Sequence, residues 1–102
     1  MNAASEQSEK EFQSQVIRLA GLHGWLTYHT FSSRRSPSGF PDLVLAHPGR
    51  GKLLFAELKR QGGGLTDAQY HWLVVLRMAG QDVRLWRPGD WPEIERVLAG
   101  GG

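Results

Sequence analysis

The chain has 102 residues, of which 40% are hydrophobic and 22% are charged, and these values suit one small folded domain. Because the chain contains no cysteine, a disulfide framework, a thiolate zinc site and a cysteine nucleophile are excluded. The net charge of +2 is unevenly spread, since residues 32–60 carry six basic and two acidic side chains. A basic middle segment is typical of a surface that binds a polyanion, although an ordinary solvated face has the same composition.

The first predicted element is a helix that begins at Ser8. Ser8 and Glu11 have the spacing of a capping box, which supplies hydrogen-bond partners to the first turn of a helix. Apolar side chains then recur every three or four residues and predict one buried face, made by Phe12, Val16, Leu19 and Ala20. The helix is expected to end within residues 21–24, where glycine occurs twice.

Three strands are predicted next. Residues 25–31 are rich in aromatic and β-branched side chains and predict the first strand, whereas the polar segment 32–39 predicts a loop. Residues 42–46 and 52–59 predict two further strands, joined by a turn over residues 47–51 that contains proline and glycine. The second and third strands are therefore expected to form a hairpin.

A second helix follows the hairpin. Thr66 and Gln69 form another capping-box pattern, and Gly80 is a typical residue for the end of a helix. The spacing of apolar residues predicts that the buried side of this helix holds Leu65, Ala68, Trp72, Leu76 and Ala79.

The last part of the chain predicts a strand and a short helix. Residues 82–87 alternate polar and apolar side chains, which is typical of a strand with one buried face. Asp90 and Glu93 have the spacing of a cap for a helix that runs to Leu98.

The element order predicts an α/β fold with a mixed four-stranded sheet flanked by helices and with a short C-terminal helix. One domain is expected over residues 8–99, with a flexible leader over 1–7 and a flexible tail over 100–102. No apolar stretch is long enough to predict a membrane span, and the first residues do not have the pattern of a secretory signal, so a cytoplasmic protein is expected.

Three charged side chains fall within predicted strands, where burial is expected. Asp42 opens the second strand, and Glu57 and Lys59 lie two residues apart on the third, so they share one face of the sheet. If Asp42 and Glu57 meet across the hairpin, their repulsion favours a cation between them, and carboxylate ligands suit Mg²⁺ or Mn²⁺. Such an ion could polarise a phosphodiester, with Lys59 placing the water or neutralising the phosphate. The alternative is a solvated Glu57–Lys59 pair on an edge strand.

Three blocks of this sequence resemble the VRR-NUC family of the PD-(D/E)xK nuclease superfamily. They occur in the family's order and are Gly39–Leu45 (GFPDLVL), Phe55–Lys59 (FAELK) and Leu65–Gln69 (LTDAQ). The likeness extends over nearly the whole chain. It implies a restriction-endonuclease-like core with the order αβββαβ.

The resemblance also implies the site residues. The catalytic centre would comprise Asp42, Glu57 and Lys59, with Glu9 and Gln69 beside it. The Mg²⁺ or Mn²⁺ ligands would be Asp42, Glu57, Glu9 and the backbone carbonyl of Leu58. Glu9 is preferred to Glu11 because Glu9 borders the buried face of the first helix, whereas capping already explains Glu11. Contacts with the DNA backbone are expected from Ser33, Arg34, Arg35, Ser36 and Gly39. Arg60 is a further basic candidate for such a contact, with an ordinary solvated surface residue as the alternative.

Stand-alone members of this family, often from phages, resemble Holliday junction resolvases that act as homodimers. The resemblance therefore implies a metal-dependent endonuclease that cuts four-way DNA junctions as a homodimer, in the bacterial host cytoplasm if the chain is phage-encoded. Recombination, packaging and repair are the alternative processes that such an activity could serve. A flap or nicking endonuclease would use the same residues. A non-catalytic nucleic-acid-binding domain is a further alternative, but the intact Asp42, Glu57 and Lys59 set argues against it.

Overall fold

The computed structural model describes residues 7–30 and 35–101. Every predicted element is present, with ends that differ from the predicted ones by a residue or two. In chain order the helices and strands are α2 (Glu9–Leu22), β1 (Leu26–His29), β2 (Leu43–His47), β3 (Lys52–Leu58), α3 (Asp67–Met78), β4 (Asp82–Trp86) and α4 (Trp91–Leu98).

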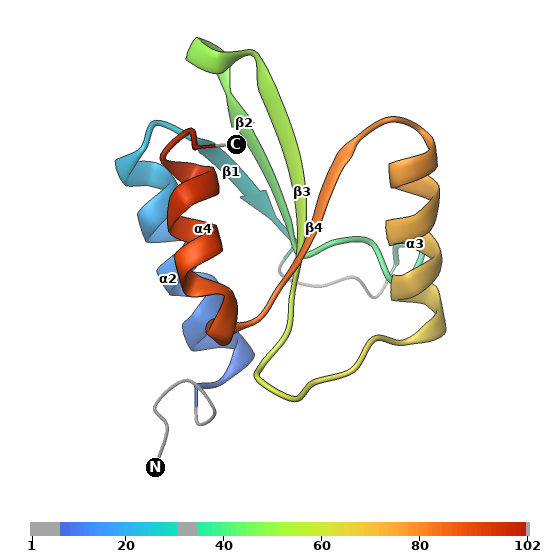
Figure 1. Cartoon of the computed structure of the whole chain (residues 1–102). Helices are drawn as coiled ribbons and strands as arrows, with labels where there is room; N and C mark the ends of the chain where they lie inside the picture. The colour runs from blue at the N-terminus through green and yellow to red at the C-terminus, as the bar shows by residue number, and fades with distance from the viewer. Residues whose placement is uncertain (1–6, 31–34, 102) are drawn as a thin grey trace.

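The four strands form one mixed sheet in the order β1-β2-β3-β4. The first three strands are antiparallel neighbours, as the hairpin pattern predicts, whereas β4 runs parallel to β3 after the crossover through α3. Helices α2 and α4 pack together on one face of the sheet, and α3 lies on the other face (Figure 1). The predicted α/β fold class is thereby confirmed.

The main core lies between the sheet and the α2–α4 layer. The predicted stripe of α2 is confirmed, since Phe12, Val16 and Ala20 are fully buried and Leu19 packs against them. Every second residue of β2 and β3 faces this layer, so the residues between them, which include Val44, Phe55 and Glu57, face the α3 side of the sheet. The sheet residues of the core are Leu43, Leu45, Leu54, Ala56, Leu58 and Trp86.

The buried side of α3 differs from the predicted one. Leu73 is its buried residue, whereas Ala79 is exposed and Trp72 and Leu76 are half-buried. The physical reason is that α3 covers only part of the sheet, beside β4, so a narrow strip of the helix is enclosed (Figure 1). Periodicity alone cannot show how wide the covered strip is.

The predicted helix caps are confirmed at two helices and wrong at the third. The side chains of Ser8 and Thr66 accept hydrogen bonds from the amides of Glu11 and Gln69, at 3.1 Å each. The carboxylate of Asp90 instead accepts from the nearby amide of Arg87 at 2.9 Å. A tight 3-10 turn, Pro88–Asp90, stands directly before α4 and takes this side chain away from the helix.

Within the described ranges, no helix is both long and apolar enough to cross a membrane.

Candidate active site

The hairpin of β2 and β3 brings the two predicted carboxylates together. Leu43 pairs with Ala56 in the sheet register, so Asp42 and Glu57 occupy the next position at the end of the ladder. Asp42 is held in place because its Oδ2 accepts a hydrogen bond from the backbone amide of Leu58, at 2.9 Å. Glu57 lies on the central strand β3, and only 1% of its side chain is exposed.

Burial makes both carboxyl groups hard to ionise. Burial, and then the negative charge of Asp42, raises the pKa of Glu57 from 4.5 to about 8. Burial also raises the pKa of Asp42 above its usual value, although the amide of Leu58 opposes this increase. A nearby cation would lower both pKa values and allow the two carboxyl groups to ionise. The raised pKa values therefore indicate that the pair needs a positive charge beside it.

Lys59 supplies part of that charge. Its Nζ lies 4.0 Å from Oε2 of Glu57, and the lysine side chain is 12% exposed. The other carboxylate oxygen of Glu57, Oε1, is buried and has no hydrogen-bond partner within the described part of the chain. A buried oxygen without a partner is unfavourable in a folded protein, and a metal ion would satisfy it.

The acidic pair suits Mg²⁺ or Mn²⁺ more than a metal that needs a complete protein cage. Among the residues that the structure describes, no group of three or more His, Asp or Glu side chains gathers closely enough to hold an ion. Mg²⁺ binds through one or two carboxylates and keeps several waters, so Asp42 and Glu57 are sufficient side-chain ligands for it. The chemistry of the donors therefore fits the predicted metal.

Glu9 approaches the pair from helix α2. It is exposed and lines a cavity of about 210 Å³ together with Gln13, Asp42 and Leu58. The carbonyl of a strand residue points to the same side as its amide, so the carbonyl of Leu58 faces Asp42 and this cavity. Glu11 points elsewhere, because its Oε1 accepts a hydrogen bond from the Ser8 hydroxyl at 2.9 Å. The geometry thus favours Glu9 over Glu11.

The predicted DNA contacts are only partly described. Ser33 and Arg34 lie outside the described residues. Arg35 and Ser36 are exposed in the loop before β2, and Arg60 is exposed two residues after the end of β3. These three side chains are therefore accessible to a DNA backbone, and their contact with DNA stays a prediction.

Gly39 has a structural role that its sequence context did not predict. Its φ is +94°, and a Cβ atom at this position would lie 2.5 Å from the backbone carbon of Ala68. The loop before β2 therefore rests directly against the first turn of α3, and glycine is needed for this close approach. Gly39 also lines a cavity beside Asp42.

Gly39→Ala is expected to destabilise the protein by at least about 3 kcal/mol, because the strain of a positive φ and an overlap with backbone add together. This loss corresponds to a decrease in Tm of about 10 °C or more, measured by thermal unfolding. The matched control is Gly62→Ala, since Gly62 has a φ of +81° but no atom within 4 Å of its added Cβ. Equal losses in the two variants would contradict the packing role of Gly39.

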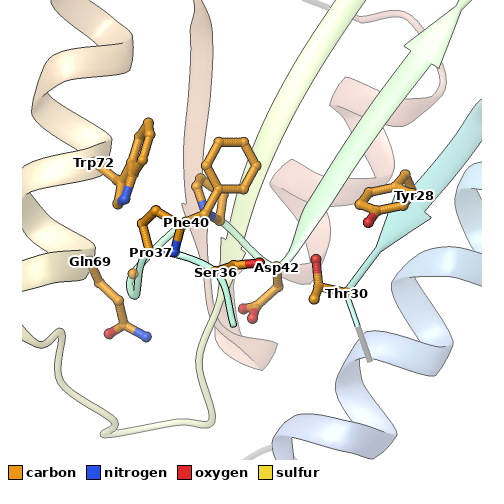
Figure 2. Close-up of a pocket in the computed structure, with 10 residues that line it drawn as sticks. Tyr28, Thr30, Ser36, Pro37, Phe40, Asp42, Gln69 and Trp72 are labelled. Atoms are coloured by element: carbon orange, nitrogen blue, oxygen red, sulfur yellow. The ribbon is translucent and has the colours of Figure 1, made fainter. Parts of the chain in front are cut away.

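A larger cavity of about 510 Å³ is also lined by Asp42 and was not predicted from the sequence (Figure 2). Aromatic side chains form much of its wall, contributed by Tyr28 of β1, Phe40 of the loop and Trp72 of α3. Gln69 lines this cavity as well, although its carbonyl oxygen also accepts from the Thr66 amide at 2.9 Å. The predicted position of Gln69 beside the site and its capping role are thus compatible.

The fold and the site define a small α/β domain with a buried acidic pair and a lysine at the end of two central strands. The chain belongs to the VRR-NUC domain family, a family of nuclease domains whose model matches residues 1–87. A segment of 52 residues is 36% identical to a Fanconi-associated nuclease 1 homolog of Schizosaccharomyces pombe (strain 972 / ATCC 24843). This segment is 51% of the chain and 7% of that much longer relative.

A solved structure of a VRR_NUC domain has the same fold. Its TM-score is 0.72 at 22% sequence identity, and the match covers 90% of this chain and 95% of that one. The family predicted from the three sequence blocks is therefore confirmed, and so is the mixed sheet flanked by helices.

Proposed function

We propose that this chain is a Mg²⁺- or Mn²⁺-dependent endonuclease that hydrolyses phosphodiester bonds in branched DNA. The observation that carries the proposal is the pair of half-buried Asp42 and buried Glu57, in which Oε1 of Glu57 has no partner within the described residues and Lys59 lies alongside. Membership of a nuclease-domain family supports the same activity, as does the likeness to a protein named as a nuclease.

Each residue of the site has a separate task in this proposal. Asp42, Glu57 and the carbonyl of Leu58 would hold the ion, whereas Glu9 faces the same cavity from α2 without being close enough to act as a third side-chain ligand. The bound ion would polarise the phosphodiester and favour ionisation of the attacking water. Lys59 places a positive charge next to Glu57, where it can orient the water or stabilise charge on the phosphate oxygens. The Leu58 amide keeps Asp42 in position before DNA arrives.

The proposed substrate is the four-way junction, cut by a homodimer. Junction resolution requires paired cuts, and a dimer with two-fold symmetry would supply two active sites in a matching arrangement. A dimer would also double the basic surface to which Arg35 and Arg60 contribute. This part of the proposal rests on the likeness to stand-alone family members.

The test is cleavage of labelled four-way junction, 5′ and 3′ flap, nicked and linear duplex DNA, each with Mg²⁺, with Mn²⁺ and with EDTA. Paired, metal-dependent cuts confined to the junction are expected, together with a dimer in sedimentation. Cutting of flaps or nicks by a monomer would refute the proposed junction specificity and still support the proposed nuclease activity. Unchanged DNA under all conditions, with tight DNA binding, would favour a binding domain instead.

A further inference from the structure

The cavity on the aromatic side of Asp42 has no task in the cleavage chemistry. Asp42 lines both this cavity and the smaller cavity that Glu9 and Leu58 line. Figure 2 shows Tyr28 and Thr30 on one side of Asp42, and Phe40 and Trp72 on the other. A molecule whose reacting group sits at the acidic pair would therefore place its neighbouring group in this cavity.

The aromatic wall is formed by side chains that are held in place but remain accessible. The indole Nε1 of Trp72 donates a hydrogen bond to the carbonyl of Ser38 at 3.2 Å. The ring of Phe40 packs edge-to-face against Trp72 and Phe55, with centroids 5.0 and 6.0 Å apart. Even so, 40% of Phe40 and 64% of Tyr28 is exposed. Exposed aromatic rings around a concave site are typical of a surface that binds a partner.

We infer that this cavity binds a nucleobase that is unstacked from the DNA next to the scissile phosphate. This inference rests on the proposed nuclease function and adds a reason for its preference for branched DNA, because bases at a branch are the easiest to unstack. Aromatic rings bind single nucleobases by stacking, in a way that tolerates any base. The amide of Gln69 and the hydroxyls of Thr30 and Ser36 line the same cavity and offer polar partners for a base edge.

The lining favours a base over a phosphate or an acidic peptide. In the part of the chain that the structure describes, no Lys or Arg side chain lines the cavity, whereas the carboxyl of Asp42 does. Within the described residues, the charged group that a second phosphate would meet there is the carboxyl of Asp42. The cavity volume of about 510 Å³ is also within the range of about 300–1,000 Å³ that is usual for small organic ligands, and a purine fits within it.

The test is an abasic scan of a branched DNA. Abasic nucleotides replace single residues around the branch, and binding is measured by fluorescence anisotropy in EDTA, so that it does not depend on cleavage. We expect one or two positions beside the cut to weaken binding by about ten-fold, the size that loss of one stacked base implies. Equal binding at every abasic position would overturn the inference.

Tyr28→Ala tests the protein side of the same contact. It should weaken binding of intact DNA by about ten-fold but leave binding of the sensitive abasic DNA unchanged, because the stacked base is already absent there. Tyr28→Phe should bind like wild type. The matched control is Tyr70→Ala, since Tyr70 is 63% exposed on α3 and does not line the cavity. Equal losses for Tyr28→Ala and Tyr70→Ala, or equal losses on intact and abasic DNA, would refute stacking on Tyr28.

The cleavage assay separates this inference from the proposed function. If the protein cuts branched DNA but its binding does not depend on the scanned bases, the proposed nuclease function stands and the proposed base site is refuted. If binding in EDTA depends on the scanned bases but the protein never cuts DNA, the proposed nuclease function is refuted and the proposed base site stands. If Tyr28→Ala fails to fold, as judged by thermal unfolding, the abasic scan of the wild-type protein decides alone.

Discussion

Asp42→Asn is expected to lower the rate of DNA cleavage by at least about a thousand-fold, with the fold and DNA binding preserved. The loss follows because the substitution removes one of the two carboxylates that would hold the metal, and metal and charge stabilisation supply much of the rate of such reactions. The fold should persist because the asparagine carbonyl oxygen can still accept the hydrogen bond that the Leu58 amide donates to Asp42. The measurement is single-turnover cleavage with saturating Mg²⁺, alongside anisotropy for DNA binding.

The control for this substitution is Asp67→Asn, which makes the same change at an exposed residue in the first turn of α3. Its cleavage rate should stay within about two-fold of wild type, because a helix-end charge contributes less than about 1 kcal/mol to stability. A second readout does not require cleavage: Mn²⁺ should raise the Tm of the wild-type protein and not that of Asp42→Asn. Cleavage by Asp42→Asn at the wild-type rate would exclude the proposed metal site.

The acidic pair could be predicted from the sequence because the hairpin register depends on local features. The turn over residues 47–51 and the alternation of β2 and β3 place Asp42 opposite Glu57 before any tertiary packing is considered. The preference for Glu9 over Glu11 likewise followed from the helical period and the cap at Ser8. What periodicity could not show is how far Glu9 stands from the pair, since that depends on how α2 packs on the sheet.

The aromatic cavity cannot be predicted from the sequence because its wall comes from three separate elements. The spacing of Trp72 predicts a core position in α3, yet its indole donates a hydrogen bond to the loop carbonyl of Ser38. Phe40 had no regular pattern around it, and Tyr28 lies on an edge strand, where alternation does not distinguish a covered face from an open one. The packing of the loop against α3, through Gly39, brings Phe40 beside Trp72, and β1 adds Tyr28 to the same cavity.

Glu57→Gln is expected to abolish cleavage and, at the same time, to stabilise the metal-free protein at alkaline pH. The glutamine keeps the shape of the buried side chain but cannot carry the charge that burial and Asp42 oppose. Because one pKa unit corresponds to about 1.4 kcal/mol, a pKa raised to about 8 implies a gain of at least about 2 kcal/mol at pH 9, or about 10 °C in Tm. The matched control is Glu95→Gln, an exposed residue of α4, which should change neither cleavage nor Tm.

The pH dependence of the wild-type Tm tests whether ionisation of Glu57 destabilises the metal-free protein. The folded state of the wild type binds the Glu57 proton more tightly than the unfolded state does, so this contribution to stability is complete below pH 4.5 and is lost as the pH rises through about 8. The Tm of the metal-free wild-type protein should therefore fall between pH 5 and pH 9, and Glu57→Gln should remove most of that decrease. Saturating Mg²⁺ should restore the wild type at pH 9 and leave the variant unchanged. If Glu57 lowers the stability of the metal-free protein at the pH at which cleavage needs its carboxylate, its role is in the proposed chemistry and not in folding. A wild-type Tm that does not change with pH would instead show that Glu57 is ionised without a metal.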